Sequence, residues 1–482
     1  MTDNQTAKKT NYRWVICAML FFATTINYMD RQVLSLTWED FIRPEFHWTN
    51  NHYGTITGIF SLFYAIAMLF AGTLVDKLDT KKGYLWSIGI WSAGACLHAL
   101  CGVATESIVG IESAEALRAL TATDMVAKVT LVSMTLFIIA RCVLALGEAG
   151  NFPAAIKATA EYFPKKDRAF STSIFNAGST IGALVAPFCI PALAARFGWE
   201  AAFVIIGALG FIWMGFWVFV YKKPEANPRV NAAELEYILQ DREEEEKAKA
   251  AAAEQAKEQK QISLWKCFSF KQTWAFSVGK FMTDGVWWFF LFWMPSYLKN
   301  VYGMSSTEPR FQIAIGVLYL IVMLSLFGGY LPTIFIEKKK MEPYAGRMRA
   351  MLIFAFFPLV ALAAQPLAHF SYWIPVILIG IAGAAHQSWS ANIFSTVGDM
   401  FPKSTIATIT GIGGMAGGLG SFLIQKSAGM IFDASAAGNW NVFGAHGIEA
   451  GYMIMFSFCA VAYLIGWVIM KVLVPKYKPV EI

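Results

Sequence analysis

The chain has 482 residues, of which 56% are hydrophobic and 15% are charged, and its mean hydropathy is +0.48. A soluble domain carries roughly 25% charged residues, so this composition excludes an ordinary water-soluble globule, a disordered chain and a disulfide-rich secreted protein. The net charge of +6 comes from basic residues scattered through short loops, and nucleic acid is therefore not an expected partner. The 7 cysteines form no CxxC pair, so we expect buried thiols and neither metal ligands nor disulfide bonds.

Apolar stretches follow one another along the chain, each long enough for a membrane-crossing helix of about 20 residues. The first has a polar N-terminal flank and no small-residue cleavage pattern, so we expect it to remain as a membrane helix. The pattern predicts an all-α polytopic membrane protein with about twelve crossings. The stretches lie near residues 14–36, 53–75, 84–104, 129–160, 169–191, 199–221, 273–298, 308–336, 347–366, 372–398, 404–431 and 447–471.

Basic residues are distributed unevenly between alternate loops. One set of loops holds Lys8, Lys9, Arg13, Lys77, Lys81, Lys82, Lys165, Lys166, Arg168, Lys338 to Lys340, Arg347, Arg349, Lys403, Lys476 and Lys478. The opposite set holds little beyond Arg43, Arg118, Arg196, Lys299 and Arg310. By the positive-inside rule both termini are predicted to be cytoplasmic, which requires an even number of crossings.

A long polar stretch, residues 222–272, divides the chain into two halves. Asn231 followed by Glu234 is typical of a capping box that opens a solvated helix. The favoured interpretation is a cytoplasmic linker between two bundles, with a docking or regulatory segment as the alternative. The predicted organisation is a cytoplasmic tail 1–13, a six-helix bundle 14–221, the linker 222–272, a second six-helix bundle 273–471 and a cytoplasmic tail 472–482.

The two halves resemble each other in sequence. Glu161-Tyr-Phe-Pro-Lys closes the fourth apolar stretch and Asp399-Met-Phe-Pro-Lys closes the tenth, and each precedes a Gly-rich segment. Gly72-Thr-Leu-Val-Asp-Lys and Gly329-Tyr-Leu-Pro-Thr-Ile form a second pair, whose different spacing is explained by an insertion near residues 105–128. Two parallel repeats joined by a cytoplasmic linker are an architecture of transporters, in which the substrate binds between the repeats near the midplane.

Several motifs resemble those of a known superfamily. The segment Gly72 to Gly83 looks like the cytoplasmic loop motif of the major facilitator superfamily. Within it, Asn27-Tyr-Met-Asp-Arg31, and Arg141 with Leu146-Gly-Glu-Ala-Gly-Asn-Phe-Pro153, resemble the anion:cation symporter family. The likeness spans nearly the whole chain.

The bacterial aldohexuronate (glucuronate and galacturonate) transporters are the branch that this chain most resembles. The resemblance is carried by Phe175-Asn-Ala-Gly-Ser-Thr-Ile-Gly-Ala-Leu-Val-Ala-Pro187, Gly328-Gly-Tyr-Leu-Pro332 and Ala385-His-Gln-Ser-Trp-Ser390. Two features depart from that branch. One is the insertion near 105–128, and the other is Asp30 before Arg31, which looks more like the organic-anion symporters in general.

The resemblance implies the major facilitator fold, with two six-helix bundles in a bacterial cell (inner) membrane. It implies a secondary active transporter that imports a hexuronate or related sugar acid by proton symport through alternating access. We expect a monomer whose partners are the sugar acid, protons and the lipid bilayer. A passive organic-anion facilitator, a non-transporting sensor on the same fold, or a symporter for aldonates or other carboxylates are the alternatives.

Catalysis and cofactors have no support in the sequence. No phosphate-binding loop, HExxH zinc motif or EF-hand loop occurs, so neither ATP-driven pumping nor metal catalysis is indicated. We therefore expect no enzyme activity, no cofactor and no metal.

Charged residues lie inside the apolar stretches, where each costs at least about 2.5 kcal/mol to insert and so needs a partner or a task. We expect Arg31 to hold a substrate carboxylate with its planar guanidinium, as the resemblance also implies. A structural ion pair with Asp30 or Glu148 is the alternative. Asp30, Glu148 and Arg141 are the predicted proton-coupling residues, because a carboxyl beside an arginine can change protonation when substrate occupies the arginine. A static network of these charges is the other interpretation.

Polar and aromatic residues in other stretches complete the predicted site. Lys280 and Asp284, one helical turn apart, can pair with each other, or Lys280 can hold a second anion. Trp287, Trp288 and Trp293 could stack on a sugar, but packing is favoured for at least two of them. A sugar acid needs a partner for every hydroxyl stripped of water, although helix-to-helix hydrogen bonds are an equal alternative for any single polar residue. The predicted substrate-binding set is Arg31, Tyr28, Tyr64, Asn176, Ser179, Lys280, His386, Gln387, Trp389 and Asn392.

Charged residues at the cytoplasmic helix ends are predicted to form a latch that holds the outward-open state. Charge that merely sets the topology is the alternative. Glycines in the fourth and eleventh stretches leave thin helix faces that permit close approach and sliding. The predicted latch residues are Asp76, Lys81, Lys82, Glu161 and Arg168.

Overall fold

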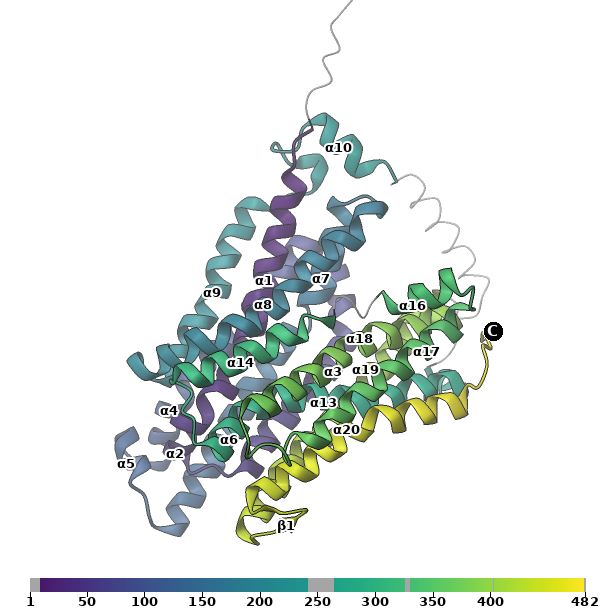
Figure 1. The fold of residues 1–482 in the computed structure, drawn as a ribbon. Helices are drawn as coiled ribbons and strands as arrows, with labels where there is room; N and C mark the ends of the chain where they lie inside the picture. Colours follow the sequence, from purple (N-terminus) through teal and green to yellow (C-terminus); the bar gives the residue numbers. More distant parts are fainter. Residues whose placement is uncertain (1–8, 242–263, 326–329, 402, 481–482) are drawn as a thin grey trace, which may run out of the picture.

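The computed structural model describes residues 9–241, 264–325, 330–401 and 403–480. The charged run that follows Asp241 and the Gly328-Gly pair of the hexuronate motif therefore lie outside the described residues. Within them the fold is all-helical except for a short antiparallel hairpin, β1 (Asn441–Val442) and β2 (Ala445–His446). Figure 1 shows long helices running through the molecule, with α10 (Ala232–Leu239) beside the start of α1 (Tyr12–Thr37).

The described residues of the first half form six further long helices and several short connecting elements. The long helices are α3 (Asn50–Leu78), α4 (Thr80–Val109), α6 (Thr123–Glu148), α7 (Asn151–Tyr162), α8 (Lys165–Phe197) and α9 (Trp199–Val220), in addition to α1. The short elements are the π-helical turn η1 (Trp38–Ile42), α2 (Arg43–Phe46), α5 (Ala114–Arg118) and the 3₁₀ turn η2 (Pro224–Ala226). The predicted insertion thus contains the end of α4, α5 and the start of α6.

The second half follows the same plan. Its long helices are α13 (Lys271–Tyr302), α14 (Pro309–Val322), α17 (Pro343–Phe356), α18 (Trp373–Met400), α19 (Lys403–Ala437) and α20 (Ile448–Leu473). Its short elements are α12 (Leu264–Cys267), α16 (Leu331–Thr333), the π-helical turn η3 (Ile334–Lys338) and the 3₁₀ turn η4 (Phe357–Ala363).

Eight helical segments of the described chain are long and apolar enough to cross a membrane, by length and composition. The other predicted stretches form α1, α13, α14 and α19, and charged side chains interrupt the apolar run in α1 and α13. The chain is therefore an all-helical polytopic membrane protein. The eight segments are Asn50–Val75, Thr80–Val109, Thr123–Tyr162, Lys166–Phe197, Trp199–Val220, Pro343–Ala363, Trp373–Met400 and Ile448–Leu473.

The end of the molecule at which the predicted linker begins and ends is called the linker side, and the opposite end the far side. On the linker side, Thr10 donates to Asn231 of the linker, and Gln272 at the start of α13 donates to the carbonyl of Lys478. Both terminal segments therefore lie on the linker side. Helix α3 starts at the far side with Asn50 and ends at the linker side with Leu78.

Helices α3 and α19, one from each half, pack with their backbones in close contact. A Cβ atom on Gly54 would lie 2.4 Å from the carbonyl oxygen of Gln425, and one on Gly429 would lie 2.3 Å from the carbonyl oxygen of Asn50. No side chain fits at such distances, so glycine is required at both positions for this approach. The two halves thus meet backbone to backbone at the far side.

Polar contacts reinforce this meeting, and we call them the far-side clamp. Asp433 of α19 accepts hydrogen bonds from the backbone N–H groups of Asn50 (3.0 Å) and Asn51 (2.8 Å), at the start of α3. Lys299, near the end of α13, forms an ion pair of 2.7 Å with Asp40 of η1. A carboxylate at a helix N-terminus satisfies free N–H donors and the helix dipole. The clamp therefore closes the far side.

The N-terminal segment is bound to the first part of the linker through Glu234. As predicted, Asn231 caps α10 and accepts from the N–H of Glu234 at 2.9 Å. The side chain of Glu234 is not solvated, however. It is fully buried and accepts from the hydroxyl of Thr10 (2.6 Å), the N–H of Tyr12 (3.0 Å) and the guanidinium of Arg13 (3.0 Å). Helix α10 therefore forms part of the first half.

Replacement of Asp433 by asparagine should open the far side. Loss of the charged cap removes about 1–2 kcal/mol, which corresponds to a roughly five- to thirty-fold shift in population. Spin labels on the exposed positions Glu115 and Phe443 report the separation of the two halves there. We expect the distance between the labels to increase in Asp433→Asn. It should not change in the control Asp79→Asn, which removes an exposed ion pair with Lys223. Equal distances in wild type and Asp433→Asn would contradict the role of the clamp.

The contact of Glu234 should also depend on pH. Burial raises the pKa of Glu234, but hydrogen bonds from Thr10, Arg13 and Tyr12 outweigh it, so the pKa lies below its ordinary value of 4.5. A lowered pKa in the folded state means that the contact is fully stabilising above pH 4.5 and is lost as the pH falls through the lowered pKa. A spin label at Asn11 should become more mobile as the pH falls through this range.

The variant Glu234→Gln should show the mobile label already at neutral pH, because charge-assisted hydrogen bonds contribute about 1.5–3 kcal/mol. Glu236, exposed on the same helix, provides the matched control Glu236→Gln, in which the label should stay as in wild type. An immobile label in Glu234→Gln would show that other contacts hold the segment.

Candidate functional site

A cavity of about 540 Å³ lies between the two halves. Its lining on the first half runs along α3 from Ser61 through Tyr64 to Thr73, and its lining on the second half includes Lys280 and Asp284 of α13 and glycines of α19. Because Thr73 lies near the linker-side end of α3, the cavity extends toward the linker side. The cavity thus lies between the far-side clamp and the linker side.

An ion pair between α1 and α6 is buried beside this cavity. The Nε and Nη2 groups of Arg31 both donate to one carboxylate oxygen of Glu148, Oε2, at 3.0 and 2.7 Å. The side chain of Arg31 is 3% exposed and that of Glu148 is 0% exposed. Of the two partners considered from the sequence, Arg31 pairs with Glu148 and not with its neighbour Asp30.

Aromatic rings from both halves surround the guanidinium of Arg31. Its Cζ atom lies 4.9 Å from the ring centroids of Tyr28 and Tyr64 and 4.8 Å from that of Trp288. A guanidinium over a ring face is attracted by the ring quadrupole. Tyr64 and Trp288 also line the cavity, so they form the layer between it and Arg31. Trp288 was not in the predicted binding set, although its position eight residues after Lys280 places it on the same helix face.

Two further charged residues of α1 and α6 are buried without such a pair. Asp30 and Arg141 are each 1% exposed. Neither the carboxylate oxygens of Asp30 nor the guanidinium nitrogens of Arg141 have a hydrogen-bond partner among the described residues. The guanidinium of Arg141 lies 5.2 Å from the ring centroid of Phe60. Buried polar groups without partners are costly, so both side chains have hydrogen-bonding capacity left for new partners.

A second ion pair lies in the wall of the cavity on α13. Lys280 contacts Asp284 at 2.7 Å, as their spacing predicted, and its ammonium lies 4.2 Å from the ring of Phe394. A Cβ atom on Gly417 would lie 2.2 Å from the carboxylate of Asp284, so the glycine makes room for this side chain. Both members of the pair line the cavity.

The remaining predicted binding residues do not line this cavity. His386 shares a hydrogen bond of 2.7 Å with the hydroxyl of Tyr463, and Asn392 donates to a carbonyl of its own helix at 2.8 Å. Trp389 is fully buried and Gln387 half-buried in α18. On α8, the hydroxyl of Ser179 donates to the backbone carbonyl of Asn176 at 2.7 Å. The binding roles of these residues stay predictions.

Three of the predicted latch residues form hydrogen bonds within the first half. Lys81 and Arg168 donate to backbone carbonyls, and Glu161 accepts from two hydroxyl groups. Lys82 is exposed. The side chain of Asp76 lies outside the described part of the chain. Among the described residues, the far-side clamp joins the two halves in this conformation, and the latch stays a prediction.

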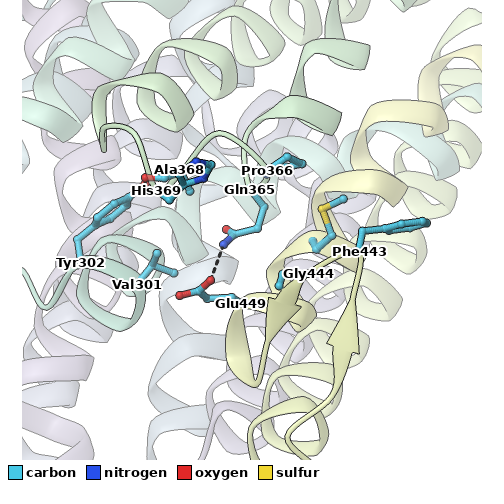
Figure 2. Close-up of a pocket in the computed structure, with 11 residues that line it drawn as sticks. Val301, Tyr302, Gln365, Pro366, Ala368, His369, Phe443, Gly444 and Glu449 are labelled. Carbon is cyan, nitrogen blue, oxygen red and sulfur yellow. Dashed lines mark hydrogen bonds between the residues drawn. The ribbon is translucent and has the colours of Figure 1, made fainter.

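A second cavity, of about 560 Å³, lies at the far side of the second half. Figure 2 shows its lining, in which Gln365 donates a hydrogen bond of 3.2 Å to Glu449, and Tyr302 and His369 face the same space. No lysine or arginine is among its described lining residues. The cavity between the halves has the Lys280–Asp284 pair in its wall and the Arg31–Glu148 pair behind Tyr64 and Trp288, and we take it as the candidate functional site.

Comparison with known proteins places this arrangement among transporters. The family model of the Major Facilitator Superfamily matches residues 20–424. The hexuronate transporter of Escherichia coli (strain K12) is 24% identical over 474 residues, which cover 98% of this chain and 96% of that protein. A probable galactarate/D-glucarate transporter of Bacillus subtilis (strain 168) is 26% identical over 438 residues, covering 90% and 88%.

Similarity to solved structures supports the same fold. A bacterial homologue of the human lysosomal transporter Spinster, in an inward-facing and unoccupied conformation, superposes with a TM-score of 0.68. The two chains are 17% identical, and the superposition covers 96% of this chain and 98% of the other. At that identity the comparison establishes the fold alone.

Removal of either partner of the Arg31 pair should destabilise the protein more than removal of both. A buried charge left alone costs about 3–5 kcal/mol, whereas an apolar pair of similar volume is often neutral. Arg31→Met and Glu148→Leu should therefore each lower the unfolding temperature in detergent, and the double variant should recover most of the loss.

The half-exposed pair of Arg43 with Glu39 is the control, because Arg43→Met should change the stability by no more than about 1 kcal/mol. If the two single losses simply add in the double variant, the two side chains are not energetically coupled.

Proposed function

This chain belongs to the Major Facilitator Superfamily, and on that premise we propose that it imports a hexuronate or related sugar acid by proton symport. It is a membrane transporter and not an enzyme. The proposal is supported by relatives that carry sugar acids by name. The observation that carries it is the buried pair of Arg31 and Glu148, separated from the cavity by Tyr64 and Trp288.

The pair explains how an anion and a proton can bind together. A substrate carboxylate has the same fork geometry as the carboxylate of Glu148 and can replace it on Arg31. Glu148 then loses its counter-charge in an apolar bundle, where a free carboxylate is costly, so it takes up a proton. Binding of the anion and uptake of the proton thereby become one event.

Asp30 and Arg141 extend this coupling within the first half. Both are buried without hydrogen-bond partners in the described chain, on helices α1 and α6 that also carry the Arg31 pair. A change of charge at Glu148 alters the potential at both groups, because the dielectric constant inside the bundle is low. We propose Asp30 as an alternative acceptor of the same proton, with Arg141 as the cation that sets the affinity of Asp30 for it.

Transport then follows from rocking of the two bundles, residues 14–221 and 273–471, about the site. In the present conformation the far-side clamp is closed and the cavity extends toward the linker side, which the positive-inside rule assigns to the cytoplasm of a bacterium. In the opposite state the clamp opens and the latch residues meet the second half. A monoanion carried with one proton moves no net charge and draws on the pH gradient alone.

Uptake into liposomes tests this mechanism. Labelled glucuronate and galacturonate are supplied with an inward proton gradient, with and without a proton ionophore. Wild type should accumulate substrate only while the gradient lasts. Arg31→Ala should lose at least about thirtyfold in uptake, because a buried charged contact contributes 2–5 kcal/mol.

The carboxyl variants separate symport from passive transport. Glu148→Gln and Asp30→Asn should exchange substrate across the membrane but no longer accumulate it against a gradient. Accumulation that persists in both variants would exclude these carboxyls as proton carriers. Equilibration without accumulation in wild type would identify a facilitator.

A further inference from the structure

Building on the proposed function, we infer that the preferred substrate is a sugar acid with a carboxylate at each end. One carboxylate binds Arg31 of the first half and the other binds Lys280 of the second. The inference narrows the proposed function: among a hexuronate and related sugar acids, it selects an acid with two carboxylates over a hexuronate, which has one.

The first support is that the site holds two cation–carboxylate pairs, one from each half. Arg31 pairs with Glu148 at 2.7 Å, and Lys280 pairs with Asp284 at 2.7 Å. A buried ion pair adds little to stability and is costly to place in a membrane. A monocarboxylate would engage one cation and leave the other pair idle in the wall of the cavity.

The second support is the arrangement of α13. Lys280, Asp284 and Trp288 follow at intervals of four residues and therefore share one face, which the cavity exposes. The helix rises about 1.5 Å per residue, so the backbone positions of Lys280 and Trp288 are about 12 Å apart. Since the Trp288 ring lies 4.8 Å from the guanidinium of Arg31, the two cations lie toward opposite ends of this wall.

The space between the two cations suits a polyhydroxylated chain. Ser61 and Tyr64 of α3 line the cavity. The hydroxyl of Ser61 donates to the carbonyl of Thr57 at 2.9 Å, so it can serve a substrate hydroxyl as an acceptor. The volume of about 540 Å³ falls in the usual range for small-ligand sites. A carboxylate that enters at the aromatic layer reaches Arg31 once Tyr64 and Trp288 part, while the other end of the molecule stays at Lys280.

The balance of charge then sets the stoichiometry. Two substrate carboxylates replace Glu148 on Arg31 and Asp284 on Lys280. The two displaced carboxyl groups are each neutralised by one proton, as buried carboxylates without counter-charges require. Two negative charges and two protons cross together, so the step moves no net charge and is insensitive to the membrane potential.

Galactarate and galacturonate provide a matched pair of probes, because they differ in having a second carboxylate in place of the aldehyde carbon. In liposomes containing the wild-type protein, we expect the KM for galactarate to be at least about tenfold lower. Proton uptake should be two per galactarate and one per galacturonate.

The variant to compare is Lys280→Gln combined with Asp284→Asn, which removes the second pair without leaving a lone buried charge. It should raise the KM for galactarate at least about tenfold and affect galacturonate several times less. Glu449→Gln, which removes a carboxylate from the far-side cavity of Figure 2, is the control and should change neither.

Two results would overturn the inference. The first is that wild type carries galacturonate but not galactarate, or that the double variant impairs transport of both to the same degree. In that case the Lys280–Asp284 pair does not bind a second carboxylate, and the proposed function stands. If neither acid is carried under any gradient, the proposed function fails and the inference fails with it.

Discussion

A charge inside an apolar helical bundle must be neutralised locally, because neither lipid nor the helix backbone can solvate it. The arrangement around the central cavity follows from this constraint. Arg31 has Glu148 as its counter-charge and three aromatic rings around it. Lys280 has Asp284, which fits only because Gly417 has no side chain. In the proposed mechanism each neutralising carboxylate is exchanged for one on the substrate, so the requirement for stability would also provide the binding chemistry.

Contacts between the halves differ in kind at the two ends of the molecule. At the far side, backbone meets backbone through Gly54 and Gly429, and Asp433 caps the first turn of α3. Around the cavity the halves meet through side chains, with the ring of Trp288 reaching across to Arg31. The far side is therefore the more closely packed contact between the halves in this conformation, whereas the contacts at the centre are made by side chains.

Much of this organisation could be predicted from the sequence. Apolar stretches located the long helices, the two-repeat pattern indicated the fold, and the four-residue spacing of Lys280 and Asp284 predicted their pairing. Other features depend on helix rotation, which hydropathy does not determine in a membrane because lipid and protein interior are both apolar. His386 and Asn392 thus pack inside the second half, and Trp288 faces Arg31 from a distant part of the chain. The burial of Glu234 could likewise not be predicted from the sequence, since its partners are more than two hundred residues away in the chain.

The closeness of α3 and α19 makes the conformational equilibrium sensitive to a single methyl group. A Cβ atom on Gly429 would lie 2.3 Å from the carbonyl oxygen of Asn50, across the closed far side. Alanine at this position would strain one conformation and leave the other free to relax. The glycine is thus a position at which substitution could trap the state with an open far side for structural work, without altering any charge of the site.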